Sequence, residues 1–204
     1  MSAGGKQSKL EYETTWQYET GIYHRFAEGI DNRFIIYYSD ITDYVTIDRA
    51  DLLHNITTSS GWNVDTVRFW GIEYEFNIAY KKLTAFGNYT YIDNEVIEDD
   101  PAKTESFMVE LPPKHKINLG FRYRLSDSLQ FTCDQRYVGR RYSEAGRTLS
   151  EYITSDVGLQ YSFYKNKAKL NAFINNLFGE NYEQTYGYPM SRQMFGLTFK
   201  YTFF

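Results

Sequence analysis

The sequence has little of what soluble enzymes and membrane-spanning helices usually need. Cys133 is the single cysteine among the 204 residues, which excludes an intrachain disulfide. No run of about 18 apolar residues occurs, so the sequence predicts no transmembrane helix. The first nine residues also lack the apolar stretch of a secretory signal peptide.

Charge of one sign is also missing. The chain has 22 Lys and Arg against 26 Asp and Glu, for a net charge of −4, and no basic stripe, which argues against a nucleic-acid partner. His24, His54 and His115 are scattered without metal-ligand spacing. No nucleophile motif is present. We therefore expect no metal site, no cofactor and no catalytic residue.

Aromatic residues, by contrast, are abundant. The chain contains 20 Tyr and 15 Phe, yet its mean hydropathy is −0.55. A sheet with one polar face and one apolar face has this composition when the apolar face meets lipid and rings form belts at both interfaces.

The order of residues supports a sheet, because apolar and polar residues alternate with a period of two. Between Trp70 and Tyr80 every even position is apolar, and Glu73 and Glu75 lie at odd positions. The same alternation predicts strands at 117–125, 156–163 and 195–203. Weaker patterns add strands near 16–27, 32–48, 83–97, 129–142 and 168–178, for about nine in all.

The connections alternate between short and long. Short joins are expected at 28–31, 80–82, 126–128 and 165–167, and long ones at 50–63, 98–111, 143–150 and 179–190. Tight periplasmic turns and long outer loops are typical of an outer-membrane barrel. An odd strand count would start the chain at the long-loop end. Because such barrels have even counts, we expect an incomplete N-terminus, with a flexible segment 1–8 and a partial barrel 9–204.

Several motifs, most of them near the C-terminus, resemble one family, the TonB-dependent outer-membrane receptors. Trp16-Gln17-Tyr18-Glu19-Thr20-Gly21, Gly71-Ile72-Glu73 and Pro113-Lys114-His115-Lys116 resemble motifs of its barrel strands. The more specific matches are Asn175, Asn176, Leu177, Phe178, Tyr182, Gly187, Tyr188, Pro189 and Arg192. Two departures are Met190-Ser191 in place of the family's Pro-Gly, and an extra final residue, Phe204.

The resemblance implies an all-β fold, an antiparallel transmembrane β-barrel. The chain would supply about the last nine strands of a 22-stranded barrel, without the plug domain. The resemblance also implies an assembly signal in the last strand, read by the barrel-assembly machinery. Its residues would be Phe199, Tyr201, Phe203 and Phe204.

The function implied by the resemblance is import of a scarce solute, with a ferric siderophore as the expected cargo. The expected location is the outer membrane of a Gram-negative bacterium. Expected partners are membrane lipid and lipopolysaccharide, the remaining strands and plug of the receptor, and the inner-membrane TonB complex. Arg140, Arg141, Tyr142 and Arg147 are the candidate ligand-binding residues in an outer loop, with lipopolysaccharide contact or plain solvation as alternatives.

Two further sets of charged residues carry weaker predictions. Arg122, Arg124, Arg136, Glu73 and Glu75 would face the lumen, either pairing with one another or contacting a plug or ligand. An acidic loop with Glu98, Asp99, Asp100 and Glu105 is a candidate Ca²⁺ site, with a hydrated loop as the simpler interpretation.

Two other readings of the sequence stay open. A tenth strand within residues 1–15 would allow a complete small outer-membrane barrel with a structural or adhesive role. Alternatively, the aromatic residues would face inward in a soluble β-sheet module that binds a ligand.

Overall fold

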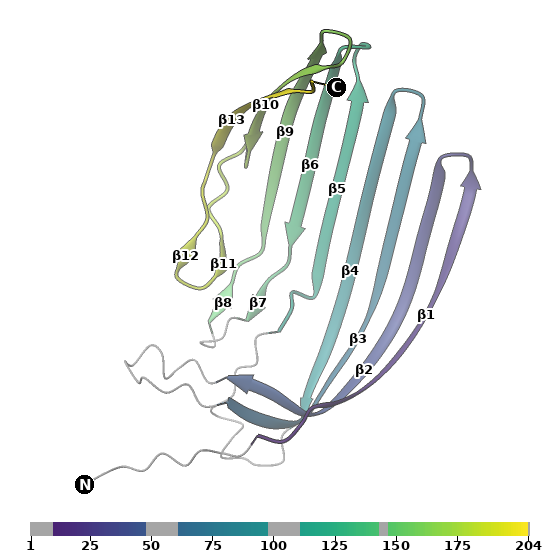
Figure 1. Cartoon of the computed structure of the whole chain (residues 1–204). Helices are drawn as coiled ribbons and strands as arrows, with labels where there is room; N and C mark the ends of the chain where they lie inside the picture. The colour runs from purple at the N-terminus through teal and green to yellow at the C-terminus, as the bar shows by residue number, and fades with distance from the viewer. Residues whose placement is uncertain (1–9, 48–60, 98–110, 143–146, 204) are drawn as a thin grey trace.

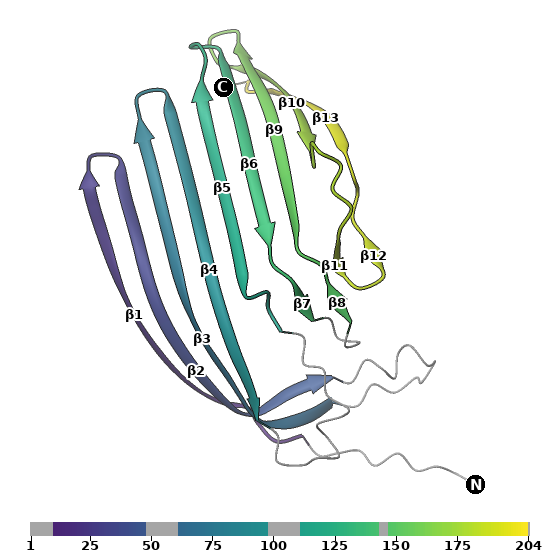
Figure 2. The same cartoon turned by 180° about the vertical axis from the view of Figure 1, so that it is seen from behind.

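Over the residues that the structure describes, the main element is one curved sheet of nine antiparallel strands (Figures 1 and 2). The computed structural model describes residues 10–47, 61–97, 111–142 and 147–203. In sheet order the strands are β1 (Thr14–Ala27), β2 (Ile30–Ile47), β3 (Gly61–Tyr80), β4 (Leu83–Ile97), β5 (His115–Arg124), β6 (Leu129–Val138), β9 (Tyr152–Phe163), β10 (Ala168–Asn175) and β13 (Met194–Tyr201). Within these ranges no helix is long and apolar enough to span a membrane.

Two small hairpins accompany the main sheet. One pairs β7 (Arg141–Tyr142) with β8 (Thr148–Leu149), and the other pairs β11 (Glu183–Thr185) with β12 (Tyr188–Pro189). Both lie at the end of the sheet opposite the short turns (Figure 1). We call these two ends the long-loop end and the short-turn end.

The chain enters the sheet at the long-loop end and leaves it at the short-turn end, as an odd number of strands requires (Figure 1). The predicted count of nine strands and the all-β antiparallel fold are confirmed. β1 and β13 are the two edges of the sheet.

The strand register sorts the alternating residues onto two faces. Ile22 lies opposite Phe34, Phe34 opposite Tyr74, Tyr74 opposite Tyr89, and Tyr89 opposite Ile117. An apolar row therefore crosses the first five strands on one face, which we call the apolar face. The residues between them form the polar face.

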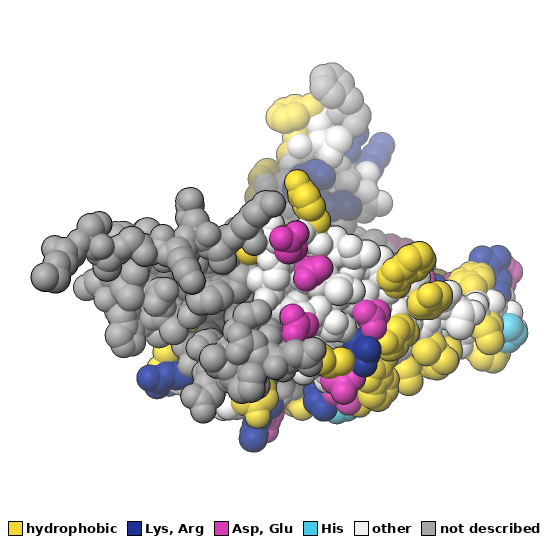
Figure 3. Space-filling view, turned by 90° about the horizontal axis from the view of Figure 1, so that it is seen from below, with side chains coloured by type: hydrophobic (Ala, Val, Ile, Leu, Met, Phe, Trp, Pro, Cys, Tyr) yellow, Lys and Arg dark blue, Asp and Glu magenta, His cyan; other side chains and the backbone are white. Residues whose placement is uncertain are grey.

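The apolar face is exposed rather than packed into a core. Ile22 and Leu197 are each 68% exposed, and the largest fully buried side chains in the described ranges are Val64 and Val67. In the view along the strands, hydrophobic side chains gather along the outer rim of the curve (Figure 3). A surface of this kind is stable when it meets lipid. The reading as a soluble module with its rings inside does not fit this arrangement.

Aromatic rings also occur on the polar face, where some lie over glycines. Phe173 occupies the space next to Gly196, and Phe86 the space next to Gly120. A Cβ at either glycine would collide with the neighbouring ring. The absence of a side chain lets each ring lie against the sheet.

Three predicted boundaries were wrong in detail. β3 begins at Gly61 and not near 70, because its first part breaks the alternation and packs Val64 and Val67 against Tyr44, Phe69 and Leu111. The strand expected at 129–142 is interrupted after Val138 and continues only as β7. The strand expected at 168–178 ends at Asn175, because Asn176 has a φ of 51°, a left-handed conformation that ends the strand.

Candidate functional site

On the apolar face, a belt of aromatic and ionic side chains crosses β2, β3 and β4 near the long-loop end. The rings of Trp70 and Tyr91 meet edge to face with centroids 5.5 Å apart. One step further toward the loops, Arg68 pairs with Asp40 at 2.9 Å and with Glu95 at 3.4 Å. Because rings prefer the membrane interface and ion pairs avoid hydrocarbon, this belt marks where the apolar band ends.

Lys114, just before β5, extends the belt with an ion pair to Asp93 at 2.7 Å. This hydrogen bond to the Asp93 carboxylate raises the pKa of the Lys114 ammonium. The alternation of residue types along the chain did not predict the belt's ion pairs. Charged residues do occur in the sequence at positions that the alternation assigns to the apolar face, but only the strand register shows that opposite charges lie side by side there.

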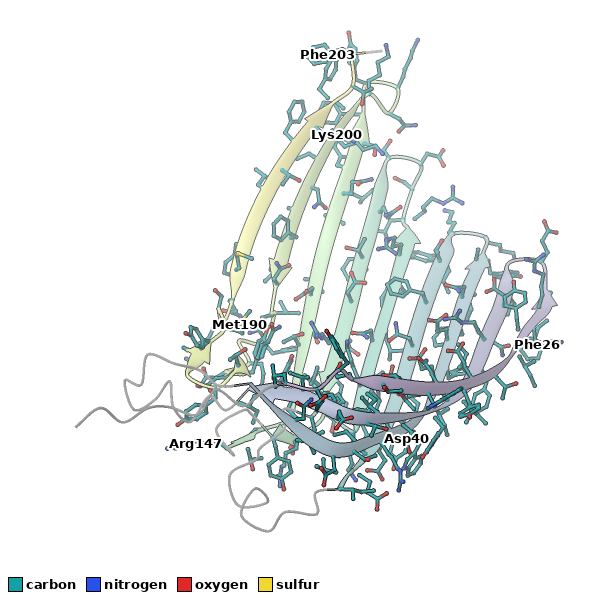
Figure 4. All side chains as sticks on the ribbon, turned by 60° about the horizontal axis from the view of Figure 1, so that its bottom comes forward. Phe26, Asp40, Arg147, Met190, Lys200 and Phe203 are labelled. Atoms are coloured by element: carbon teal, nitrogen blue, oxygen red, sulfur yellow. The ribbon has the colours of Figure 1, made fainter. Side chains whose placement is uncertain are left out.

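The short-turn end has a second aromatic belt that includes the end of β13. Phe199, Tyr201 and Phe203 are 64%, 39% and 76% exposed, and the rings of Tyr201 and Phe203 lie 4.9 Å apart. The strand register places Phe199 and Tyr201 on the apolar face, as predicted. Phe204 lies outside the described residues. Phe203 and Arg147 mark the two opposite ends of the molecule in Figure 4.

The predicted ligand-binding residues of the outer loop do not share one role. Arg140 pairs with Glu151 at 3.5 Å, and both side chains are at least half exposed. Tyr142 is 58% exposed. These two residues remain accessible from outside, whereas Arg141 and Arg147 contact the neighbouring hairpin.

Arg141 connects the two hairpins of the long-loop end. Its Nη2 donates to the backbone carbonyls of Glu183 and Gln184, at 3.1 and 2.6 Å. The guanidinium lies over the ring of Tyr152, 5.9 Å from its centroid, and Tyr152 stacks on Tyr182 at 4.1 Å. Its Nη1 is buried without a hydrogen-bond partner among the described residues. Arg141 therefore holds the β11–β12 hairpin in place.

Arg147 makes a second link between the same hairpins. Its guanidinium lies 4.9 Å from the ring centroid of Tyr186, in the turn of the β11–β12 hairpin. Gly187 in that turn has a φ of 79°, and its N–H donates to the Glu183 carboxylate at 3.0 Å. Tyr188 and Pro189 of the Gly-Tyr-Pro motif form β12. Most of this motif is thus explained by the hairpin it builds.

Asn176 organises the connection from β10 to β13. It is only 5% exposed, and its backbone N–H donates to the Asp156 carboxylate at 2.7 Å. Its side chain accepts from the Glu180 N–H at 2.9 Å and donates to the carbonyls of Glu180 and Ser191, at 2.8 and 3.3 Å. The Asn side chain both donates and accepts, and Asn tolerates a positive φ. Asp also tolerates a positive φ, but its ionised carboxylate cannot donate.

The neighbours of Asn176 in the Asn-Leu-Phe motif have simpler roles. The Leu177 N–H donates to the Ser155 carbonyl at 2.7 Å, and the Leu177 carbonyl accepts from the Gln193 amide at 2.6 Å. Phe178 is 77% exposed. Together these bonds return the chain across the end of the sheet and into β13.

A hollow of about 480 Å³ lies between the sheet and this returning segment. Asp134, Arg136 and Asp156 line it from the sheet, and Tyr182 and Arg192 from the segment. The Nε of Arg136 is buried and has no hydrogen-bond partner among the described residues. Burial raises the pKa of the Tyr182 hydroxyl, and the nearby Arg136 partly opposes this.

The predicted lumen-facing residues share the polar face. Pairing among them was one expectation, but Glu75 has a partner from outside the predicted set. Glu75 pairs with Arg33 at 3.2 Å rather than with Arg122 or Arg124. Arg122 lies over the Phe86 ring, 5.4 Å from its centroid. Among the described residues, no ion pair therefore joins two members of the predicted set.

The sequence predicted no metal site. The described residues contain no group of three or more His, Cys, Asp or Glu side chains that could hold a metal ion. His24 packs edge to face on Phe26, and His115 shares a 2.9 Å hydrogen bond with Tyr89. His54 and the acidic loop with Glu98, Asp99, Asp100 and Glu105 lie outside the described residues.

Comparison with known proteins places this fold among receptors. Residues 2–177 match the family described as "TonB dependent receptor-like, beta-barrel". The metal-pseudopaline receptor CntO of Pseudomonas aeruginosa is 32% identical over 114 residues, which cover 52% of this chain and 16% of that protein.

Two solved structures illustrate the likeness in fold. The ferric-catecholate import receptor Fiu from E. coli K12 has a TM-score of 0.74 and 19% identity, covering 98% of this chain and 30% of that one. The copper transporter OprC has a TM-score of 0.72 and 15% identity, covering 96% and 32%. The chain thus spans about a third of the length of these structures. By name these relatives are transport receptors, not enzymes.

Proposed function

Because the chain belongs to the TonB-dependent receptor-like β-barrel family, we propose that it forms part of the wall of an outer-membrane receptor that imports a scarce solute. The observation that carries this proposal is the curved amphipathic sheet, with rings and aliphatic side chains exposed on one face and charged residues on the other. The apolar face would contact outer-membrane lipid, and the polar face would line the lumen.

The proposed cargo is a ferric siderophore. Arg140 and Tyr142 are accessible near the long-loop end, and a cation beside an aromatic ring suits an anionic, ring-bearing metal chelate. Fiu is named for a ferric catecholate, CntO for a metal–pseudopaline complex and OprC for copper. Because these relatives are named for different cargoes, uptake has to be compared for several classes of metal chelate.

In the proposed mechanism this chain takes part in ligand capture but does not transport the ligand alone. Its long-loop end would take part in ligand capture, and passage would require the remaining strands, a plug and the inner-membrane TonB complex. The edges β1 and β13 support this division, since strand edges in hydrocarbon leave backbone groups unpaired at a cost of several kcal/mol each. The barrel-assembly machinery would read the aromatic end of β13, and lipopolysaccharide would contact the ionic belt.

Membrane placement is tested first, with tryptophan fluorescence. Trp70 is 44% exposed on the apolar face, so a variant that keeps only Trp70 should be quenched by brominated lipid, most strongly when the bromines are near the headgroups. Iodide dissolved in the surrounding water should quench the fluorescence of the same variant only weakly. Strong iodide quenching together with no lipid quenching would overturn the membrane assignment.

The cargo is tested in cells of the native host. Uptake of ⁵⁵Fe should be compared for catecholate, hydroxamate and carboxylate siderophores, and uptake of copper should be measured alongside, in wild type and in a strain with this reading frame disrupted. The proposal expects loss of uptake for one ferric siderophore, with an equal loss when TonB is removed. Unchanged iron uptake for all three classes would contradict it.

A further inference from the structure

Basic residues gather at the short-turn end of the sheet, from β3 to β13. The segments 79–85, 122–131, 161–170 and 198–203 form this end, and they contain eight Lys and Arg. Only Asp127 of the chain's 26 Asp and Glu lies in them. This end of β3 to β13 is therefore cationic, although the chain as a whole has a net charge of −4.

The β3–β4 turn brings three of these cations together. Lys81 and Lys82 are the turn residues, and both are exposed. Arg124 of β5 is bound to the same turn, because its Nη2 donates to the Lys81 carbonyl and its N–H to the Lys82 carbonyl, each at 2.9 Å. None of the three forms an ion pair with a carboxylate of the described residues. We call these three residues the cationic turn.

Lys81 places part of this charge on the lipid side of the sheet. Its Nζ lies over the ring of Tyr80, 4.9 Å from the ring centroid. Tyr80 belongs to the alternating set of Tyr74 on the apolar face, and its row continues through Leu83 to Tyr123 of β5. Tyr80 and Tyr123 are 57% and 42% exposed. The Lys81 ammonium therefore lies beside rings of the apolar face and not on the polar face.

The chemistry of the cationic turn matches an acidic phospholipid headgroup. Rings at the end of an apolar band mark the level of the membrane interface, and lysines at that level extend their ammonium groups toward the headgroups. Ammonium groups and Tyr hydroxyls donate hydrogen bonds to phosphate oxygens. A lipid held there would also lay its acyl chains along the row of Tyr80, Leu83 and Tyr123, a contact that a free anion cannot make.

We propose that the cationic turn binds the headgroup of an acidic phospholipid, such as phosphatidylglycerol, in the periplasmic leaflet. Lys81 and Lys82 contact the phosphate, and Arg124 fixes the turn through the Lys81 carbonyl. The bound phosphate would reduce the repulsion among the three cations. This inference rests on the proposed function, because it takes the apolar face as lipid-facing and the short turns as periplasmic.

The test measures which lipid surrounds a tryptophan beside the cationic turn. Leu83 lies next to the turn on the apolar face, so the reporter is Leu83→Trp in the full chain with its three native Trp replaced by Phe. The chain is folded into phosphatidylcholine vesicles that contain a fixed fraction of brominated phosphatidylglycerol or brominated phosphatidylcholine. The ratio of the two quenching efficiencies gives the relative binding constant at this position.

Phosphatidylglycerol should be preferred about tenfold at the Leu83→Trp reporter. Each Lys or Arg near an anionic lipid surface changes an affinity about fivefold, and the cationic turn has two exposed lysines. Added salt should reduce the preference.

A second reporter tests whether the preference is local. A chain that keeps only Trp70 reports the opposite end of the apolar face in the same vesicles, whose two leaflets have the same composition. There the charge of Arg68 is balanced by Asp40 and Glu95. Trp70 should therefore show no preference for phosphatidylglycerol.

The decisive variants of the Leu83→Trp chain differ in where charge is removed. Lys81→Gln/Lys82→Gln should lower the preference to about twofold or less, whereas Lys81→Arg/Lys82→Arg should retain it. The matched control Lys165→Gln/Lys167→Gln removes the same charge from the β9–β10 turn. That turn is four strand spacings or about 19 Å away, beyond the Debye length of about 8 Å, so the preference should stay within about twofold of its starting value. Circular dichroism shows whether each variant keeps its strand content.

Four results would overturn the proposal. The first is equal quenching of the Leu83→Trp reporter by the two brominated lipids, and the second is an equal loss of preference in the two Gln double variants. The third is an equal preference at Trp70, which would mean that no single turn selects the lipid. The fourth is displacement of phosphatidylglycerol by soluble hexaglutamate, or by inorganic phosphate beyond the effect of sodium chloride at equal ionic strength.

The same measurement separates this inference from the proposed function. Quenching of both reporters without a preference between the lipids would end the inference and leave the membrane placement standing. Quenching of neither reporter by either lipid would contradict the membrane placement as well.

Discussion

The two halves of the sheet extend to the long-loop end in different ways. In the N-terminal half, β1 to β4 are 14, 18, 20 and 15 residues long and carry the ladder itself toward the long-loop end. In the C-terminal half, β5, β6, β9, β10 and β13 are 10, 10, 12, 8 and 8 residues long. There the chain beyond the strands is held by side chains such as Arg141 and Asn176. Backbone pairing stabilises one half of this end, and a few side chains stabilise the other.

Charge follows the same division. On β2 to β4 the basic side chains Arg33 and Arg68 each meet a carboxylate on a neighbouring strand. On β5, β10 and β13 the basic residues of the polar face, Arg122, Arg124, Lys169 and Lys200, meet none in the described ranges. The strand register therefore brings opposite charges together on β2 to β4 and leaves these four cations of β5, β10 and β13 without a carboxylate partner among the described residues.

The largest expected effect is one that both halves share, on the apolar face. Ile22→Lys in β1 and Leu197→Lys in β13 replace side chains of equal exposure, and each should lower the free energy of unfolding in lipid vesicles by about 3 kcal/mol. Urea titration measures it. Thr198→Lys, which changes the polar face of the same strand, should cost far less. If Thr198→Lys cost as much as Leu197→Lys, the assignment of the two faces would be wrong.

The next effect should appear only in the C-terminal half. Asn176→Ala removes three side-chain hydrogen bonds at a buried site and places a Cβ-only residue at a positive φ, so the free energy of unfolding should fall by about 2 kcal/mol. Trypsin should also cleave the chain near Arg192 more quickly. The adjacent Asn175→Ala is the control, since Asn175 lies within regular β10 pairing. Identical behaviour of the two variants would remove the special role of Asn176.

A smaller effect is expected for the link between the hairpins. Arg141→Lys keeps the charge but cannot donate to two carbonyls in the same planar geometry, so the β11–β12 hairpin should loosen by about 1 kcal/mol. Hydrogen exchange of the amides in residues 182–190 measures the loosening. Arg140→Lys is the matched control, because Arg140 makes an exposed ion pair. Exchange that rises equally in both variants would show that Arg141 does not hold the hairpin.

The smallest effect is expected in the N-terminal half, at the ionic belt. Arg68→Gln removes two partly exposed ion pairs, so the free energy of unfolding should fall by only about 0.5 kcal/mol, and less at high salt. Urea titrations at low and high salt measure the difference. A loss as large as that of Asn176→Ala would erase the contrast between a half held by its ladder and a half held by side chains.

Much of the sheet was predictable because alternation is a local property. The strand expected at 83–97 coincides with β4, and the two faces expected for 70–80 are those of β3. The first part of β3 was missed, because Val64 and Val67 are both buried and therefore interrupt the alternation. The outer-loop cluster was expected as one group, but Arg141 and Arg147 contact the β11–β12 hairpin. No property of residues 140–147 alone indicates that contact.

By itself, the sequence determined the period-two pattern, the number of strands, the ends at which turns are short, and the residues of the apolar face. These depend on neighbours along the chain and on the pleat, which alternates side chains between faces. The tertiary structure alone decided which charges meet, as in Asp40, Arg68 and Glu95, and which are left opposed, as in Lys169 and Lys200. Those contacts depend on strand register, which joins residues distant in sequence and shifts every pair if it slips by one.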